Sequence, residues 1–134
     1  MIILTNSTSL TLGPGQSATF DTEILHTGCA ECHRIGSGAV TLTMKNAIYE
    51  IAAGGNIGAT TAGENANLTV FVGGSPLPET EMNSATAAVG DVNNVFRSTF
   101  VPTCCCGAES VTVRNNGETT IVLEDPILKI KRVA

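Results

Sequence analysis

Charged residues are scarce in this sequence. Lys, Arg, Asp and Glu make up 14% of its 134 residues, against about 25% in typical soluble domains. The seven basic residues are scattered, apart from three near the end, and the net charge is −5. Because phosphate binding needs a clustered basic face, we expect no nucleic-acid partner. So sparsely charged a surface favours a protein that works outside the cytoplasm or inside a large assembly.

Long apolar runs are also missing. No stretch approaches the roughly 20 residues that a membrane-spanning helix needs. The opening MIILTNSTSL has neither the basic segment nor the long apolar segment of a secretory signal. We therefore expect no transmembrane segment, no signal peptide and no membrane partner.

Helical periodicity is absent, and apolar residues alternate with polar ones instead. Turn-forming Gly and Asn recur about every ten residues. The alternation predicts no substantial helix and a series of strands at Ser9–Leu12, Ser17–Thr27, Val40–Lys45, Ala47–Ala59, Leu68–Val72, Val92–Val101, Val111–Val113, Thr119–Leu123 and Ile127–Val133. One further short strand is expected within Ser75–Val89, a polar stretch with two prolines.

Three local signals refine these predictions. Gly54-Gly55 indicates a bulge or bend within its long strand. Asn115-Asn116-Gly117 is typical of a hairpin turn, because Asn and Gly tolerate positive φ. Asp125-Pro126 predicts a break before the last strand.

Short antiparallel strands in a chain of this length predict an all-β fold, an antiparallel jelly-roll sandwich. An immunoglobulin-like sandwich competes, but the sequence has no Trp and so lacks the Cys-Trp-Cys arrangement of that fold. The length suits a single domain spanning residues 1–134.

Three stretches resemble jelly-roll domains of the tumour-necrosis-factor (TNF)-like and complement-globular-head-like group. These are SLTLGPGQSATFDT, LTVFVGGSPLPET and the closing ESVTVRNNGETTIVLEDPILKIKRVA. The HTGCAECHRIGSG segment is similar to small phage proteins of that group, whose bacterial and phage members occur in virion proteins, fibres and spore-surface glycoproteins. The sequence departs from the pattern in having Cys104-Cys105-Cys106 and no collagen-like stalk.

The resemblance implies a compact homotrimer. Several strands are apolar on both faces, and a second apolar face needs a cover. A trimer interface would supply that cover, with candidate residues Ile48, Tyr49, Phe71, Phe96 and Phe100. The alternative is that loops of the same subunit cover these side chains.

Cys29-Ala-Glu-Cys32-His33 matches the attachment pattern of c-type haem. We expect no haem, because the motif falls between predicted strands and only four Phe and one Tyr are available to shield a porphyrin. Zinc is the better cofactor hypothesis, with His26, Cys29, Cys32 and His33 as ligands. Two rivals stay open for the five cysteines, a disulfide from Cys29 or Cys32 to one of Cys104, Cys105 and Cys106, or reduced thiols throughout.

Catalysis has little support in the sequence. A cysteine nucleophile would have to pair with His26 or His33, with Glu31 as an orienting acid. The acidic pairs Glu79/Glu81 and Glu124/Asp125 are typical of solvated loops, and neither Gly-Gly pair precedes a helix, which excludes a phosphate cradle of the usual kind.

The sequence therefore favours a structural or interaction protein rather than an enzyme. We expect a homotrimeric jelly roll at a phage virion surface, as a head-decoration or fibre-type component whose partner is a capsid or other virion protein. The apolar Ile2 and Ile3 are the candidate docking residues. The alternatives are a metal-binding or redox domain built on the Cys29/Cys32/His33 segment, and a lectin-like head that binds host-surface glycans.

Overall fold

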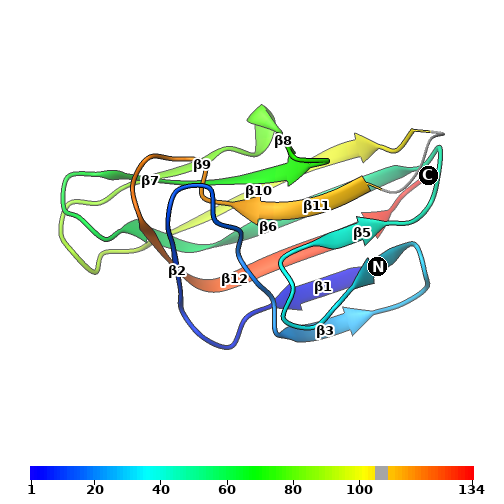
Figure 1. The fold of residues 1–134 in the computed structure, drawn as a ribbon, viewed down its shortest axis with the longest axis horizontal. Helices are drawn as coiled ribbons and strands as arrows, with labels where there is room; N and C mark the ends of the chain where they lie inside the picture. Colours follow the sequence, from blue (N-terminus) through cyan, green and yellow to red (C-terminus); the bar gives the residue numbers. More distant parts are fainter. Residues whose placement is uncertain (105–108) are drawn as a thin grey trace.

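The computed structural model describes residues 1–104 and 109–134. They form an all-β fold with one short 3-10 turn, η1, as the sequence predicts (Figure 1). Among these residues, no helix is long and apolar enough to cross a membrane. The elements are β1 (Ile2–Thr5), β2 (Leu10–Leu12), β3 (Thr22–His26), β4 (Glu31–His33), β5 (Val40–Leu42), β6 (Ile48–Ala59), β7 (Asn65–Val72), β8 (Ser75–Pro76), η1 (Pro78–Thr80), β9 (Met82–Ala85), β10 (Asn93–Pro102), β11 (Glu109–Arg114) and β12 (Ile121–Arg132).

The strands form two antiparallel sheets. The first, sheet A, has the order β10-β6-β12-β1-β3, and β2 pairs with the start of β12. The second, sheet B, has the order β4-β5-β11-β7-β8, and β9 pairs with the start of β7. Neighbouring strands that are far apart in the sequence give the crossovers of a jelly roll.

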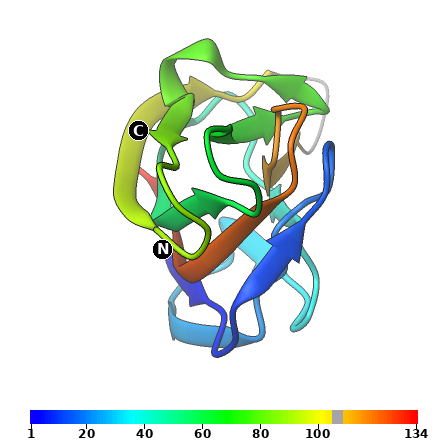
Figure 2. The same cartoon turned by 90° about the vertical axis from the view of Figure 1, so that its left-hand side faces the viewer.

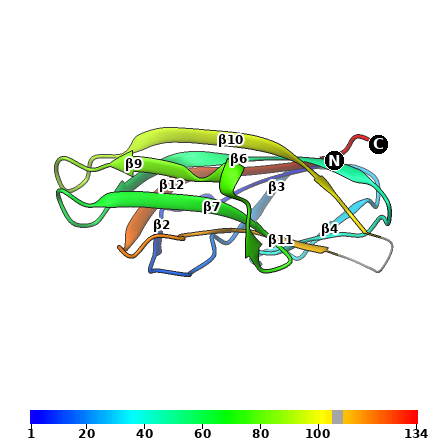
Figure 3. The ribbon, with the colours of Figure 1, turned by 90° about the horizontal axis from the view of Figure 1, so that it is seen from above.

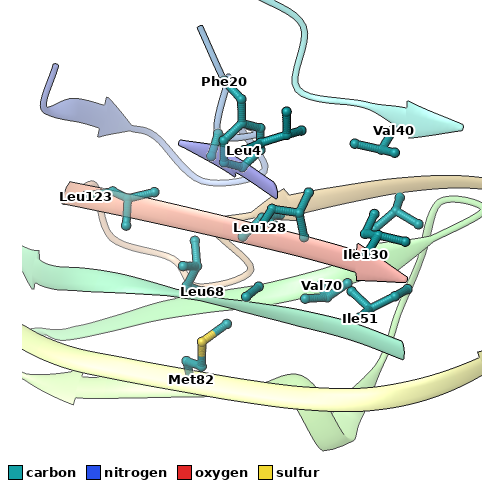
Figure 4. Close-up of a cluster of buried hydrophobic side chains, with 14 of the residues drawn as sticks. Leu4, Phe20, Val40, Ile51, Leu68, Val70, Met82, Leu123, Leu128 and Ile130 are labelled. Carbon is teal, nitrogen blue, oxygen red and sulfur yellow. The ribbon is translucent and has the colours of Figure 1, made fainter. Parts of the chain in front are cut away.

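One hydrophobic core lies between the sheets. Alternate residues of the strands point inward, so each sheet contributes one apolar face. Figure 4 shows Leu4, Ile51, Leu128 and Ile130 of sheet A close to Leu68 and Val70 of sheet B, all of them fully buried. The core therefore follows directly from the alternation in the sequence.

The predicted irregularity near Gly54-Gly55 lies on the neighbouring strand. Strand β6 is continuous, whereas the register of β12 against β6 shifts between Glu124 and Ile127. Asp125 has a positive φ of 48° at this bulge. The predicted break at Asp125-Pro126 is thus a bulge within one strand of 12 residues, because the hydrogen bonds resume at Ile127.

The predicted hairpin at Asn115-Asn116-Gly117 is wrong. Strand β11 belongs to sheet B and β12 to sheet A, so the segment crosses between the layers. Among the described residues, non-glycine positive φ occurs only at Asn46 and Asp125, so neither asparagine adopts a type I′ turn. Asn115 instead is buried, and its side-chain amide donates to Leu12 O at 3.0 Å and to Thr119 O at 2.8 Å.

The two long sides of the sandwich are formed by different pairs of edge strands. In the end view β10 lies at the left and β3 at the bottom, the two edges of sheet A (Figure 2). Seen from above, β9 runs beside β10 (Figure 3), and Asn93 Nδ2 donates to Ser84 Oγ across this side at 2.8 Å. On the other side the edge strands β3 and β4 approach each other. Strand β4 was not predicted, because three residues are too few to show a period.

Candidate functional site

The outer face of sheet A carries an exposed aromatic patch. Phe96 and Phe100 lie on the edge strand β10, and 58% and 61% of their surfaces are exposed. Their register partners on β6 are Gly54 and Glu50. Since successive residues of a strand alternate in direction, both rings point away from the core, and we call this pair the aromatic patch.

Small residues of β6 shape the floor beside the patch. A Cβ atom built on Gly54 would meet the carbonyl oxygen of Val95 and lie 2.9 Å from Phe96 Cδ2. The ring therefore packs over a position where only glycine fits. Ala52, the next outward residue of β6, is 4% exposed. The surface over these small residues is lower than the two projecting rings beside it. Another protein surface can complement this shape.

Strand β12 extends the same face beyond β6. Ile127 lies opposite Gly54 and Lys129 opposite Ala52. Ile127 is 37% exposed. The face thus combines apolar side chains with a lysine, the mixture that is typical of the core and rim of a protein interface.

Two of the predicted trimer contacts are wrong. Tyr49 is fully buried in the subunit, where its hydroxyl donates to Ala30 O at 2.6 Å and accepts from Met44 N at 3.2 Å. Phe71 is 9% exposed because the Arg114 guanidinium covers its ring, 4.8 Å from the centroid. The subunit itself therefore covers these two residues.

The other three predicted contacts lie at the surface. Ile48 is 42% exposed at the start of β6, and Phe96 and Phe100 form the aromatic patch. All three are exposed, and their contact with another subunit stays a prediction. The sequence did not indicate Gly54 and Ile127 as part of this face, because their positions in it depend on β6 lying between β10 and β12.

The docking prediction is wrong for Ile2. Strand β1 is paired on both sides, with β12 and with β3, and Ile2 is fully buried. Its apolar side chain packs in the hydrophobic core. Ile3 points the opposite way, between Lys129 and Leu25 in the sheet register, and its contact with another protein stays a prediction.

The cysteine-histidine segment does not form the predicted metal centre. Cys32 and His33 lie on β4, and Cys29 and Cys32 carry exposed free thiols. Within residues 1–104 and 109–134, no three His, Cys, Asp or Glu side chains converge so as to hold a metal ion. The predicted set fails because both imidazoles turn toward Glu23, not toward the thiols.

The predicted disulfide from this segment is also absent from the structure, since Cys29 and Cys32 are free. Cys105 and Cys106 lie outside the described residues. A cysteine nucleophile would need a histidine as its base, and the polar contacts of His26 and His33 run to carbonyl oxygens and to Glu23. Neither imidazole is therefore oriented to act as a base for the thiols.

A shallow polar groove runs along the side of the sandwich between β9 and β10. Its volume is about 260 Å³. The lining residues are Met82, Asn83, Asn94, Val95, Phe96 and Arg97. The groove shares Phe96 with the aromatic patch, so any partner that covers this ring also closes one wall of the groove.

No family model and no curated protein matches the chain. Solved structures match it in fold. Murine APRIL at pH 8.5, of the TNF family, superposes with a TM-score of 0.58 at 11% identity over 96% of both chains. The phage protein PRD1 vertex protein P5 gives a TM-score of 0.57 at 15% identity, over 99% of this chain and 96% of its own.

A second structure of murine APRIL, at pH 5.0, gives a TM-score of 0.55 at 12% identity, over 96% of this chain and 98% of that one. These proteins have TNF-like jelly-roll folds. The chain is a TNF-like jelly roll, which confirms the fold predicted from its sequence. At such low identity the likeness establishes the fold alone.

Proposed function

We propose that this chain is a non-enzymatic structural protein that forms a homotrimer and decorates the surface of a phage virion. The aromatic patch carries the proposal. The TNF-like fold, shared with PRD1 vertex protein P5, supports it. The expected partners are two further copies of the chain and a capsid or other virion protein.

The energetics of the patch favour a partner. Complete burial of a Phe side chain stabilises by about 1.5–3 kcal/mol, and most of that gain is still unrealised for Phe96 and Phe100 in the single subunit. Exposed apolar side chains on an edge strand also invite uncontrolled association. A closed threefold arrangement covers each patch with a neighbouring subunit and leaves no patch free.

The test is native mass spectrometry of the purified protein. The expected species is a trimer of about 41 kDa, three times the chain mass of 13.8 kDa. The double variant Phe96→Ser/Phe100→Ser should lose the trimer, because hydroxyls replace the apolar rings that the proposed interface would bury. Val89→Ser is the matched control, since Val89 is 71% exposed and lies in the loop between β9 and β10, outside the aromatic patch.

The outcomes separate clearly. A monomeric wild-type protein, or a double variant that remains trimeric, contradicts the self-association proposal. Loss of the trimer in Val89→Ser as well would place the interface elsewhere. Circular dichroism of the double variant confirms that the sandwich still folds.

The virion role needs a separate experiment. Wild-type protein should co-sediment with phage capsids that lack it, and it should saturate at a fixed number of copies per particle. Ile3→Asp tests the docking prediction, because Ile3 is half-buried on the outer face of sheet A. Unchanged particle binding by this variant would remove Ile3 from the docking surface.

Glycan binding is a second candidate, favoured by the groove between β9 and β10. The Asn94 amide and the Arg97 guanidinium offer polar contacts, and the exposed Phe96 ring offers a surface for stacking. An NMR titration with monosaccharides should shift the amide signals of β10 if the groove binds sugar. Shifts that persist in Arg97→Ala and Asn94→Ala would count against the groove as the site.

A further inference from the structure

A small cavity lies on sheet A at the end of the sandwich where β9 turns into β10 (Figure 3). Gly58 of β6 lies at its floor, and Val122 and Glu124 of β12 line one side. Val122 is the register partner of Gly58. The loop of residues 89–92 lines the other side. Because alternate residues of a strand share a face, Gly58 lies on the same outer face as Gly54, and the cavity opens on that face.

The glycine at the floor is what allows the loop to lie there. A Cβ atom on Gly58 would overlap the carbonyl oxygen of Asp91 and lie 3.3 Å from Val92 Cγ1. Any other residue would therefore push the loop away from β6. The loop is also anchored, since Ala59 N donates to the buried Thr86 Oγ1 at 2.8 Å. The cavity is thus held open before any ligand arrives.

The size and lining of the cavity suit a single side chain. Its volume is about 160 Å³, whereas sites for drug-sized ligands measure about 300–1,000 Å³. Three valines, Val89, Val92 and Val122, supply most of its apolar side chains. Val89 is 71% exposed. A narrow apolar chain that entered the cavity would therefore cover valine surface that water now contacts.

The charges at the cavity all have one sign. Among the described residues that line it, the charged ones are Asp91, which is exposed, and Glu124, which is half-buried. Within the described part of the chain, neither carboxylate has a hydrogen-bond or ion-pair partner. Two unpaired carboxylates beside a low-dielectric wall attract a cation. The ligand should therefore be positively charged as well as apolar.

We propose that this cavity is a docking site for a lysine side chain of a partner protein. The four methylene groups of lysine pack against the valines, while the compact ammonium group stays in contact with water and with the two carboxylates. A purely apolar side chain would leave the carboxylates unpaired, and a metal ion would gain nothing from the valines. The net charge of −5 also favours a basic partner surface.

The test is an NMR titration of the ¹⁵N-labelled protein at neutral pH with a capped Gly-Gly-Lys-Gly-Gly peptide. Saturable shifts are expected at roughly millimolar peptide, confined to the amides of residues 58–60, 89–92 and Val122. The same peptide with norleucine in place of lysine keeps the apolar stem and lacks the charge. It should bind about tenfold more weakly, the scale of two exposed ion pairs.

Asp91→Asn/Glu124→Gln should weaken binding of the lysine peptide by about the same factor. Asp125→Asn is the matched control, because Asp125 is exposed next to Glu124 but does not line the cavity. Asparagine also tolerates the positive φ of 48° at that position. This control should bind the peptide as the wild type does. Unchanged binding by the double variant, or equal binding of the norleucine peptide, would overturn the proposal.

The titration is repeated with Phe96→Ser/Phe100→Ser, so that the outcome does not depend on the proposed trimer. Similar binding by both proteins supports a site that stays open to an outside partner. Binding by the variant alone would mean that a second copy of the chain covers the cavity, and it would overturn docking of a different protein. Absence of saturable shifts at the cavity in both proteins would overturn the site itself.

Discussion

At the scale of single residues, Gly54 shows how one missing side chain shapes a surface. Gly54→Ala places a methyl group against the Val95 carbonyl oxygen and the Phe96 ring. We expect a loss of about 1–3 kcal/mol in the free energy of unfolding, as in other overpacked sites, and a weaker trimer because the ring moves. Urea denaturation and native mass spectrometry measure the two effects.

Gly13→Ala is the control for this prediction. The new methyl would approach Gln16 Oε1 at 3.3 Å, the far end of a flexible side chain that can move away. Equal effects of the two substitutions would mean that the close approach at Gly54 is unimportant.

Asp21 gives a prediction about pH at the same scale. The Ser7 hydroxyl donates to Asp21 Oδ2 at 2.7 Å, the Ser7 amide to Oδ1 at 3.0 Å, and the Thr22 hydroxyl to Oδ1 at 2.9 Å. These bonds, with the Ser7 hydroxyl the largest cause, lower the pKa of Asp21 below its usual 3.8. They favour the ionised form, so the stability they add is present above the ordinary pKa and is lost as the pH falls through the lowered one.

Ser7→Ala should therefore be less stable than wild type at neutral pH, and the gap should close in acid. Thermal melts from pH 7 down to about pH 2 measure it, with Ser9→Ala as the control for loss of an exposed hydroxyl. A gap that stays constant over this range would contradict the assignment to Asp21.

At the scale of elements, the crossing from β11 to β12 depends on one buried amide. Asn115 donates to two carbonyls and accepts from Gly117 N at 3.0 Å. Asn115→Asp replaces the donor with a buried carboxylate oxygen that faces two acceptors. We expect a loss of about 3 kcal/mol or more, measured by urea denaturation.

Asn116→Asp is an unusually close control, since the adjacent asparagine is exposed. It should change stability by less than about 0.5 kcal/mol. Similar losses in both variants would mean that the amide bonds of Asn115 do not hold the crossing.

Strands with a clear alternation of apolar and polar residues were predictable from the sequence. The strands with which they pair were less predictable. The alternation of Lys129 and Lys131 with Leu128 and Ile130 identified β12 and its faces. The turn chemistry of Asn115-Asn116-Gly117 is local, however, and cannot tell a hairpin from a crossing between layers, because that choice depends on which strands already flank β12.

The candidate site shows the same limit. The sequence indicated Phe96 and Phe100 as interface candidates, and both are exposed. Burial of Phe71 depended on Arg114, which reaches its ring from the neighbouring strand β11. Pairing of His33 with Glu23 required β3 and β4 to be brought together, which no spacing along the chain revealed.

At the scale of the whole molecule, one core shared by two sheets predicts one cooperative unit. The monomeric Phe96→Ser/Phe100→Ser variant should unfold in a single calorimetric transition with equal calorimetric and van't Hoff enthalpies. The enthalpy should be about 90 kcal/mol near 60 °C, from about 0.7 kcal/mol per residue. Two resolved transitions would contradict the assignment of residues 1–134 to a single domain.

The position of β12 in sheet A has a consequence for how the protein is made. Strand β12 lies between β6 on one side and β1 and β2 on the other. Until residues 121–132 leave the ribosome, sheet A exists as the separate pairs β10-β6 and β1-β3 and the unpaired β2, each with a free edge that can bind a neighbouring nascent chain. The sheet therefore cannot close before residues 121–132 have been synthesised, and a ribosome that stalls before Ile121 releases a product prone to aggregate.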